Sequence, residues 1–171
     1  MSSELPSKDE PSNLALVGLV ADLLLKNQWM MATAESCTGG MISAACTDLS
    51  GSSNWFERGF VTYSDAAKTE LLGVGAALIK KHGAVSEEVA RAMATGALSR
   101  SPAQVSVAVT GVAGPTGGSA AKPVGTVWFG FALPGQVVSE VRRFDGDRAA
   151  VRAATIRHAL QRLVELLQPT P

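Results

Sequence analysis

The sequence has few charged residues, and its opposite charges balance. Lys and Arg together number 15 among 171 residues, Asp and Glu also number 15, and charged residues make up only 18% of the chain. A protein that binds nucleic acid or an anionic membrane through its charge carries an excess of Lys and Arg, usually gathered in a run or patch. We therefore expect no nucleic-acid partner and no membrane partner.

Cysteine and histidine are scarce as well. The two cysteines, Cys37 and Cys46, form no CxxC motif, and the two histidines, His82 and His158, do not cluster with them in the sequence. Structural zinc sites need such clusters, and small disulfide-rich folds need more cysteines. The sequence also lacks the fingerprint of an organic cofactor. It therefore predicts a protein with no metal, no cofactor and no disulfide framework.

Long apolar runs are missing too. The longest one near the beginning, over residues 14–25, is interrupted by Gly18 and Asp22 and is too short to cross a bilayer. No basic segment precedes this run, as one does in a secretory signal peptide. We expect a cytoplasmic protein, in which the thiols stay reduced.

The apolar residues that are present suffice for one folded domain. They make up 46% of the chain, whose length suits a single domain with its own core. Residues 1–11 are polar and contain two prolines, so we expect a flexible N-terminal segment there. Residues 12–171 contain no linker and no internal repeat, and we expect them to form a single domain.

Helical and strand patterns alternate along this domain. Spacing and capping residues predict helices over 12–27, 41–48, 65–72 and 86–99, and a last helix that begins at 146–147 and continues to about 167. Short apolar segments predict strands over 30–35, 58–63, 105–109, 124–132 and 137–144, the last two as a hairpin. This order indicates a three-layer α/β/α sandwich with a mixed, mostly parallel sheet. Ligands bind such sheets beyond the carboxyl ends of the strands.

A turn between a predicted strand and a predicted helix carries the first candidate site. Its sequence is AESCTGG over residues 34–40. A hydroxyl on Ser36 would project from the edge of the sheet beside free amides of the helix start, which can stabilise an oxyanion. Ser36 is therefore a candidate nucleophile, although Ser36 or Thr38 could equally be a helix cap. Cys37 is a rival nucleophile, but no histidine motif supplies its base, and a small buried residue is the plainer interpretation.

The segment YSDAAK over residues 63–68 supplies a candidate base. Lys68 follows Tyr63 by about one helical turn, and a lysine in a dry pocket can act as a neutral base towards a serine. From the local sequence alone, a solvated lysine and a packed tyrosine are the more common interpretations, and nothing local overturns them. If Lys68 is not the base, Glu35 or Tyr63 is the next candidate.

A glycine-rich loop, TGVAGPTGG over residues 110–118, follows a further predicted strand. Its glycines let backbone amides approach an anion closely, and Lys122 could close over that anion. Arg148 lies at the start of the last helix, where the helix dipole disfavours a cation, so it is a second candidate anion ligand. A plain connecting loop and an exposed arginine are the alternatives.

Taken in order, the motifs resemble those of the competence-damage-inducible CinA C-terminal domain family. The resemblance covers about residues 12–167, and the sequence contains this domain alone, as the stand-alone members do. It is carried by AESCTGG (34–40), GFVTYSDAAK (59–68), LGV (72–74), GAVS (83–86), TGVAGPTGG (110–118), KPVGTVWF (122–129) and FDGDRAAVR (144–152).

The resemblance implies an amidohydrolase that converts nicotinamide mononucleotide to nicotinate mononucleotide and ammonia, and so recycles pyridine nucleotides. It implies Ser36 as the nucleophile and Lys68 as its base, with Tyr63 and Thr110 beside them. We expect substrate contacts from the turn, the glycine loop and two cations, namely Cys37, Thr38, Gly39, Gly40, Gly111, Gly114, Gly117, Gly118, Lys122 and Arg148. We also expect a homo-oligomer such as a dimer.

The alternative is a non-catalytic module that binds a nucleotide or a protein partner in competence or DNA damage. The Ser, Lys, Tyr and Arg positions of the motifs are all occupied in this chain. Their presence favours an active enzyme.

Overall fold

Five strands form the centre of the protein, whose computed structural model describes residues 9–171. The first strand along the chain is parallel to both of its neighbours, the second and third strands, whereas the fourth strand is antiparallel to the third and to the fifth. Four strands thus point the same way, which confirms the predicted mixed, mostly parallel sheet. In spatial order the strands are β2 (Phe56–Val61), β1 (Met31–Glu35), β3 (Val105–Gly111), β4 (Thr126–Leu133) and β5 (Gln136–Arg143).

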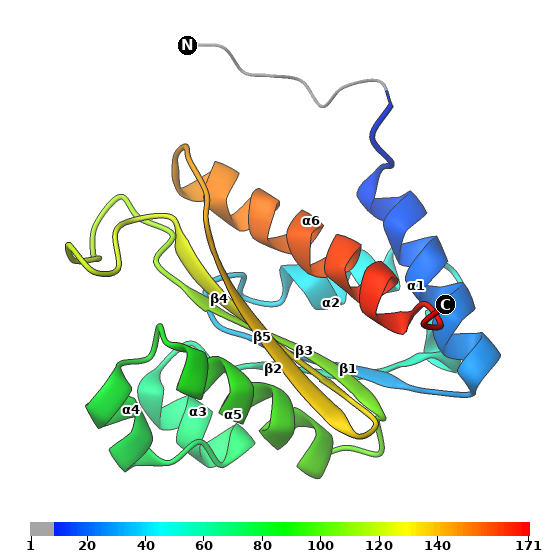
Figure 1. Ribbon diagram of the computed structural model, residues 1–171, viewed down its shortest axis with the longest axis horizontal. Helices are drawn as coiled ribbons and strands as arrows, with labels where there is room; N and C mark the ends of the chain where they lie inside the picture. The colour runs from blue at the N-terminus through cyan, green and yellow to red at the C-terminus, as the bar shows by residue number, and fades with distance from the viewer. Residues whose placement is uncertain (1–8) are drawn as a thin grey trace.

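Helices cover both faces of the sheet, so the predicted three-layer sandwich is confirmed (Figure 1). One layer contains α1 (Asn13–Asn27), α2 (Met41–Thr47) and α6 (Arg148–Leu167). The other layer contains α3 (Asp65–Leu72), α4 (Ala76–His82) and α5 (Glu87–Ser99). A short 3-10 helix, η1 (Ser52–Asn54), precedes β2.

Each helical layer has its own apolar core, because successive side chains of a strand point to opposite faces. Large side chains such as Met31 and Phe129 pack towards α1 and α6, whereas small ones such as Ala34 and Ala108 face α5. At Gly130 of β4, an added Cβ would lie 2.4 Å from the carbonyl oxygen of Ala90 in α5. Small residues therefore let α5 approach the sheet closely.

The structure corrects several predicted boundaries. Helix α4 lies where we predicted no element, and its sequence signal is weak because it has seven residues, one of them buried, and no side-chain cap. Strand β2 covers 56–61 instead of 58–63, since this edge strand is half exposed and lacks an apolar run. The first hairpin strand begins at Thr126 instead of 124, after Gly125, whose φ is +94°.

The N-terminal prediction is tested in part. Residues 1–8 of the predicted flexible segment lie outside the described residues. Further along the segment, Glu10 forms a salt bridge with Arg157 of α6, and the carbonyl of Pro11 accepts a hydrogen bond from the same guanidinium. Among the helices within residues 9–171, none combines the length and apolar character that a membrane span requires.

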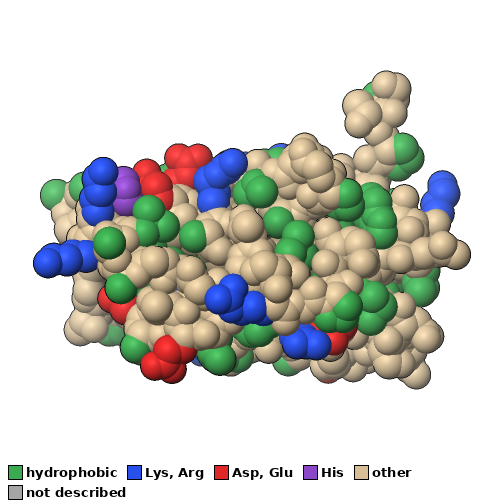
Figure 2. All heavy atoms as spheres, turned by 90° about the horizontal axis from the view of Figure 1, so that it is seen from below, with side chains coloured by type: hydrophobic (Ala, Val, Ile, Leu, Met, Phe, Trp, Pro, Cys, Tyr) green, Lys and Arg blue, Asp and Glu red, His purple; other side chains and the backbone are tan. Residues whose placement is uncertain are grey.

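The surface formed by α3, α4 and α5 carries charges of both signs. Figure 2 shows this face, with Lys and Arg side chains scattered among Asp and Glu side chains and small apolar areas. The balance of charge in the sequence is thus also visible on this face of the molecule.

The strand order fixes where a ligand can bind. β1 lies between β2 and β3, and α2, which follows β1, covers one face, whereas α3, which follows β2, covers the other. Neighbouring chain segments therefore diverge at the carboxyl end of β1 and leave a crevice there. Ser36 is the residue that follows this strand end.

Candidate active site

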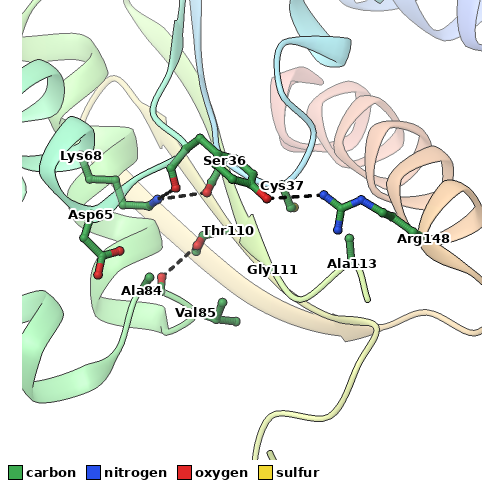
Figure 3. Close-up of a pocket in the computed structure, with 11 residues that line it drawn as sticks. Ser36, Cys37, Asp65, Lys68, Ala84, Val85, Thr110, Gly111, Ala113 and Arg148 are labelled. Carbon is green, nitrogen blue, oxygen red and sulfur yellow. Dashed lines mark hydrogen bonds between the residues drawn. The ribbon is translucent and has the colours of Figure 1, made fainter. Parts of the chain in front are cut away.

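A pocket of about 270 Å³ opens at the carboxyl ends of β1 and β3 (Figure 3). Its floor comes from the sheet, and its walls come from both helical layers, with α3 on one side and α6 on the other. The lining residues are Ser36, Cys37, Tyr63, Asp65, Lys68, Ala84, Val85, Thr110, Gly111, Ala113 and Arg148.

Ser36 reaches this pocket because of the alternation along β1. Its neighbour Glu35 points to the layer of α2, so the next side chain points to the layer of α3. The Ser36 amide continues the sheet by donating to the carbonyl of Val109 at 3.1 Å. The hydroxyl is thus held at a strand end, 8% of the residue being exposed.

Lys68 meets Ser36 as we predicted from the sequence. Ser64 caps α3 by accepting a hydrogen bond from the Ala67 amide, which places Lys68 on the inner face of the helix. Its Nζ lies 3.0 Å from Ser36 Oγ, 2.8 Å from the carbonyl oxygen of Thr62 and 3.2 Å from that of Tyr63. Burial lowers the pKa of Lys68, because an ammonium group loses its hydration there.

The partners of Nζ fit either protonation state of the amine. A neutral lysine has two N–H groups and one lone pair, whereas an ammonium group has three N–H groups and none. As an ammonium, Lys68 donates to the two carbonyl oxygens and to Ser36 Oγ; as a neutral amine it can keep the two carbonyl partners and turn its lone pair to the Ser36 hydroxyl. Lys68 can therefore accept the proton of Ser36 without rearrangement.

Glu35 is the residue of this turn that the sequence offered only as an alternative base. Its carboxylate is fully buried. One oxygen accepts from Thr38 Oγ1 at 2.6 Å and from the Ile42 amide at 2.8 Å, and the other accepts from the amide and hydroxyl of Ser43 at 3.0 and 2.8 Å. The carboxylate thus anchors the start of α2, whose own N-cap, Gly40, makes no side-chain hydrogen bond. With both oxygens occupied, Glu35 is not available as a base for Ser36.

Some backbone amides of the turn have no acceptor among the described residues, and one of them belongs to Cys37, which lines the pocket. The Gly39 amide donates to the Ser36 carbonyl, and the Met41 amide donates to the Thr38 carbonyl. In residues 9–171 no acceptor takes the amides of Cys37, Thr38 or Gly40. Free amides beside a nucleophile can stabilise the negative oxygen of a tetrahedral intermediate.

Cys37 and the histidines do not form a competing centre. Burial raises the pKa of the Cys37 thiol to about 11, so the reactive thiolate is scarce near neutral pH. His158 pairs with Glu140, and His82 pairs with Glu88, and neither ring lines the pocket. Within residues 9–171, no three His, Cys, Asp or Glu side chains gather closely enough to hold a metal ion.

The other predicted catalytic residues lie around the pocket. Thr110 is buried, and its hydroxyl donates to the carbonyl of Ala84 at 2.9 Å. The Tyr63 hydroxyl lies 3.5 Å from a guanidinium nitrogen of Arg148, so the two side chains meet across the opening. Arg148 also donates to the carbonyl of Gly114 at 2.9 Å, which ties α6 to the glycine loop.

The structure separates several of the predicted substrate contacts from the pocket. Lys122 donates from Nζ to the carbonyl of His82 at 2.7 Å and is absent from the lining. Thr38 bonds to Glu35, so its hydroxyl supports the turn instead of facing a ligand. Gly111 lines the pocket, whereas Gly39, Gly40, Gly114, Gly117 and Gly118 lie outside its lining.

A second pocket of about 640 Å³ adjoins the first and shares Ala113 and Arg148 with it. Arg152, which we did not single out from the sequence, lines this pocket. Its guanidinium donates to the carbonyls of Cys37 at 3.1 Å and Thr38 at 3.3 Å, so α6 braces the turn that holds Ser36. The signal was present, because Arg152 follows Arg148 by four residues and shares its helix face.

Comparisons with known proteins show which family this chain resembles. Residues 13–167 match the family model described as the CinA C-terminal domain. The nicotinamide-nucleotide amidohydrolase PncC of Enterobacter agglomerans is 57% identical over 134 residues, covering 78% of this chain and 82% of that protein. The protein of the same name from Pseudomonas putida is 58% identical, covering 78% and 84%. A crystal structure of a CinA superfamily protein from Escherichia coli has a TM-score of 0.89 at 39% identity, covering 95% of this chain and 94% of that one.

Proposed function

Because this chain belongs to the CinA C-terminal domain family, we propose that it hydrolyses the carboxamide of nicotinamide mononucleotide to nicotinate mononucleotide and ammonia. The observation that carries the proposal is the contact between Ser36 and Lys68. A hydroxyl 3.0 Å from a buried amine with a lowered pKa is an activated nucleophile. The names of the close relatives supply the substrate, since both are nicotinamide-nucleotide amidohydrolases.

In the first half of the reaction, the lone pair of Lys68 takes the hydroxyl proton as Ser36 Oγ attacks the carboxamide carbon. The C–O bond forms while the carbonyl oxygen becomes an oxyanion. Lys68 then gives the proton to the amide nitrogen, the C–N bond breaks and ammonia leaves. The product of this half is an ester between Ser36 and the nicotinoyl group.

In the second half, a water molecule attacks the ester and gives a proton to Lys68. The proton passes to Ser36 Oγ as the C–O bond to the enzyme breaks, and nicotinate mononucleotide is released. Both halves pass through an oxyanion, for which we assign the free amide of Cys37, a residue that lines the pocket, as a donor. No step uses a metal or an organic cofactor.

The two adjoining pockets suggest how the nucleotide lies. The carboxamide must reach Ser36 in the first pocket, and the cleft continues past Arg148 into the second. We assign the phosphate to Arg148 and Arg152, whose guanidinium groups suit a phosphate. Tyr63, next to Arg148, would close over the ribose. Lys122 is left out of this assignment because its amine donates a hydrogen bond to the backbone carbonyl of His82.

The biological setting of the reaction follows from the same proposal. Deamidation of the mononucleotide returns it to pyridine nucleotide synthesis, and we place this recycling in the cytoplasm. Cys37 and Cys46 are free thiols, which suits a reducing compartment. The homo-oligomer remains a prediction, which the molar mass in solution would test.

The first test is ammonia release from nicotinamide mononucleotide by the purified protein. Ser36→Ala should lower turnover by at least about 1000-fold without unfolding the protein, because the nucleophile is lost. Cys37→Ala is the matched control and should retain most of the activity. Coupled detection of ammonia and far-ultraviolet circular dichroism would measure both properties.

Failure of the wild-type protein to release ammonia would favour the other hypothesis, a nucleotide-binding or partner-binding module. The module would still bind the nucleotide but would leave it intact. A Ser36→Ala variant with near-normal turnover would instead retain the enzyme and refute the serine mechanism.

A further inference from the structure

Asp65 is the acidic side chain among the residues that line the pocket. It begins α3, three residues before Lys68 and on the same helix face. As an acidic residue in the first turn of α3, it also interacts favourably with the helix dipole. Ser64 already caps the helix, and no hydrogen bond or salt bridge within residues 9–171 uses the Asp65 carboxylate.

The charges of the site are separated in space. In Figure 3 the Asp65 carboxylate lies beside Lys68 on the α3 side of the pocket, and the Arg148 guanidinium reaches in from the α6 side. Arg152 adds a second guanidinium in the adjoining pocket. One end of the cleft is therefore negative, next to the nucleophile, and the other end is positive.

A pyridine nucleotide has the same separation of charge. Its ring nitrogen carries the ribose and is therefore a permanent cation, and its phosphate is an anion at the far end of the ribose. Once the carboxamide on the ring reaches Ser36, the cationic ring lies at the α3 end. Among the residues that line this pocket, Asp65 supplies the carboxylate that such a cation can face.

We propose that the Asp65 carboxylate recognises the positive charge of the pyridinium ring, so that the site selects N-ribosylated, cationic pyridine amides over neutral ones. This inference rests on the proposed function and adds a determinant of specificity to it. Opposite charges at the two ends of the cleft also fix the direction in which the nucleotide enters.

The test compares two ligands that differ in ring charge. Nicotinamide mononucleotide has a cationic ring, whereas its 1,4-dihydro form has a neutral ring with the same carboxamide, ribose and phosphate. Both would be titrated by calorimetry into the Ser36→Ala protein, in which no turnover occurs. Asp65→Asn in this background should weaken binding of the cationic form about 5- to 10-fold and change binding of the neutral form less than about twofold.

Two further variants separate recognition from other effects. Asp65→Glu restores the charge and should restore the preference for the cationic ring. Glu70→Gln removes the same charge from an exposed position of α3 and should change neither affinity. Equal weakening of both ligands by Asp65→Asn, or no weakening of either, would overturn the inference.

The outcome also separates the inference from the proposed function. A wild-type protein that releases ammonia from nicotinamide mononucleotide, together with an Asp65→Asn variant that does not discriminate by charge, would leave the function intact and refute the inference. A Ser36→Ala protein that binds neither nucleotide, with no ammonia release by the wild type, would refute both.

Discussion

Lys68 is a cation by its ordinary chemistry, yet the structure surrounds its amine with uncharged groups. Two carbonyl oxygens and one hydroxyl lie within 3.2 Å of Nζ. Desolvation lowers its pKa, while the Asp65 carboxylate raises it by a smaller amount. The net shift is downward, the direction that makes the neutral, basic form of the amine easier to reach.

At this scale we expect Lys68→Arg to be nearly as damaging as Lys68→Ala, with a loss in kcat/KM of about 1000-fold or more. A guanidinium group does not give up its proton at working pH, so it cannot act as the base.

In the wild-type protein, kcat/KM should rise with pH, because the neutral amine is the active form. The rise should level off below the ordinary lysine pKa of about 10.4, because burial lowers the pKa of Lys68. Steady-state kinetics between pH 6 and pH 10, where the fold is intact by circular dichroism, would measure both effects.

A different result would change the assignment of the base. If Lys68→Arg kept most of the turnover, Lys68 would act through its charge, and Tyr63 would become the next candidate. Glu35 would not, because its oxygens already accept five hydrogen bonds from β1, the turn and the start of α2.

Some residues of the site could be predicted from the sequence and others could not. Ser36 and Lys68 were predicted by their motifs, and the structure brings them together. The roles of Glu35 and Arg152 in supporting the turn were not predicted. Both residues hold the backbone of the turn in place, and such contacts depend on the packing of α2 and α6. A lone acidic residue in the otherwise apolar and small-residue strand MATAE was the available signal for Glu35.

Among the elements, helix α2 depends on a residue that lies outside it. Its first turn has no acidic residue, and its N-cap is a glycine without a side-chain hydrogen bond. The buried carboxylate of Glu35 takes over that task for the amides of Ile42 and Ser43. The end of β1 and the start of α2 therefore form one rigid unit around Ser36.

We predict that Glu35→Gln lowers the free energy of unfolding by about 2–4 kcal/mol. The carboxamide has the same shape, but its NH2 group faces donors where an acceptor is needed, and it remains buried. Activity should fall as well, because the turn that positions Ser36 loosens. Urea unfolding and ammonia release would measure the two losses.

Glu70→Gln offers a control on an exposed site, where the same change should alter stability by less than about 0.5 kcal/mol. A Glu35→Gln protein as stable and active as the wild type would show that the turn holds without this carboxylate.

Elements also differ in how well the sequence predicted them. The buried strands β1 and β3 and the long helices α1 and α6 were predicted to within a few residues, because burial on a defined face imposes a regular apolar pattern. Helix α4 was missed, since a short helix with one buried residue has hardly any pattern to detect. The position of β1 between β2 and β3 was not predicted, because the spacing of residues along the chain does not fix the order of strands in a sheet.

At the scale of the whole molecule, the site draws on both helical layers, which lie on opposite faces of the sheet. Lys68 and Asp65 come from α3 on one face, and Arg148 and Arg152 come from α6 on the other. A nucleotide bound along the cleft would contact both helices at once. Its binding energy would then oppose the separation of either layer from the sheet.

We therefore expect nicotinamide mononucleotide to raise the melting temperature of the Ser36→Ala protein by about 5–10 °C at a concentration of about 100 times Kd. Nicotinamide riboside, which lacks the phosphate, should bind more weakly and give a smaller shift at the same concentration. Differential scanning calorimetry would measure the two shifts. Equal shifts would contradict the assignment of the phosphate to Arg148 and Arg152.

The carboxylate at the α3 end of the pocket also bears on what happens once the amide has been cleaved. The reaction replaces a neutral carboxamide with a carboxylate, and this new negative charge forms beside Asp65. The ring charge that drew the substrate in is then balanced within the product itself. Repulsion from Asp65 would speed departure of the spent nucleotide, so the site that admits a cation would also limit inhibition by its own product.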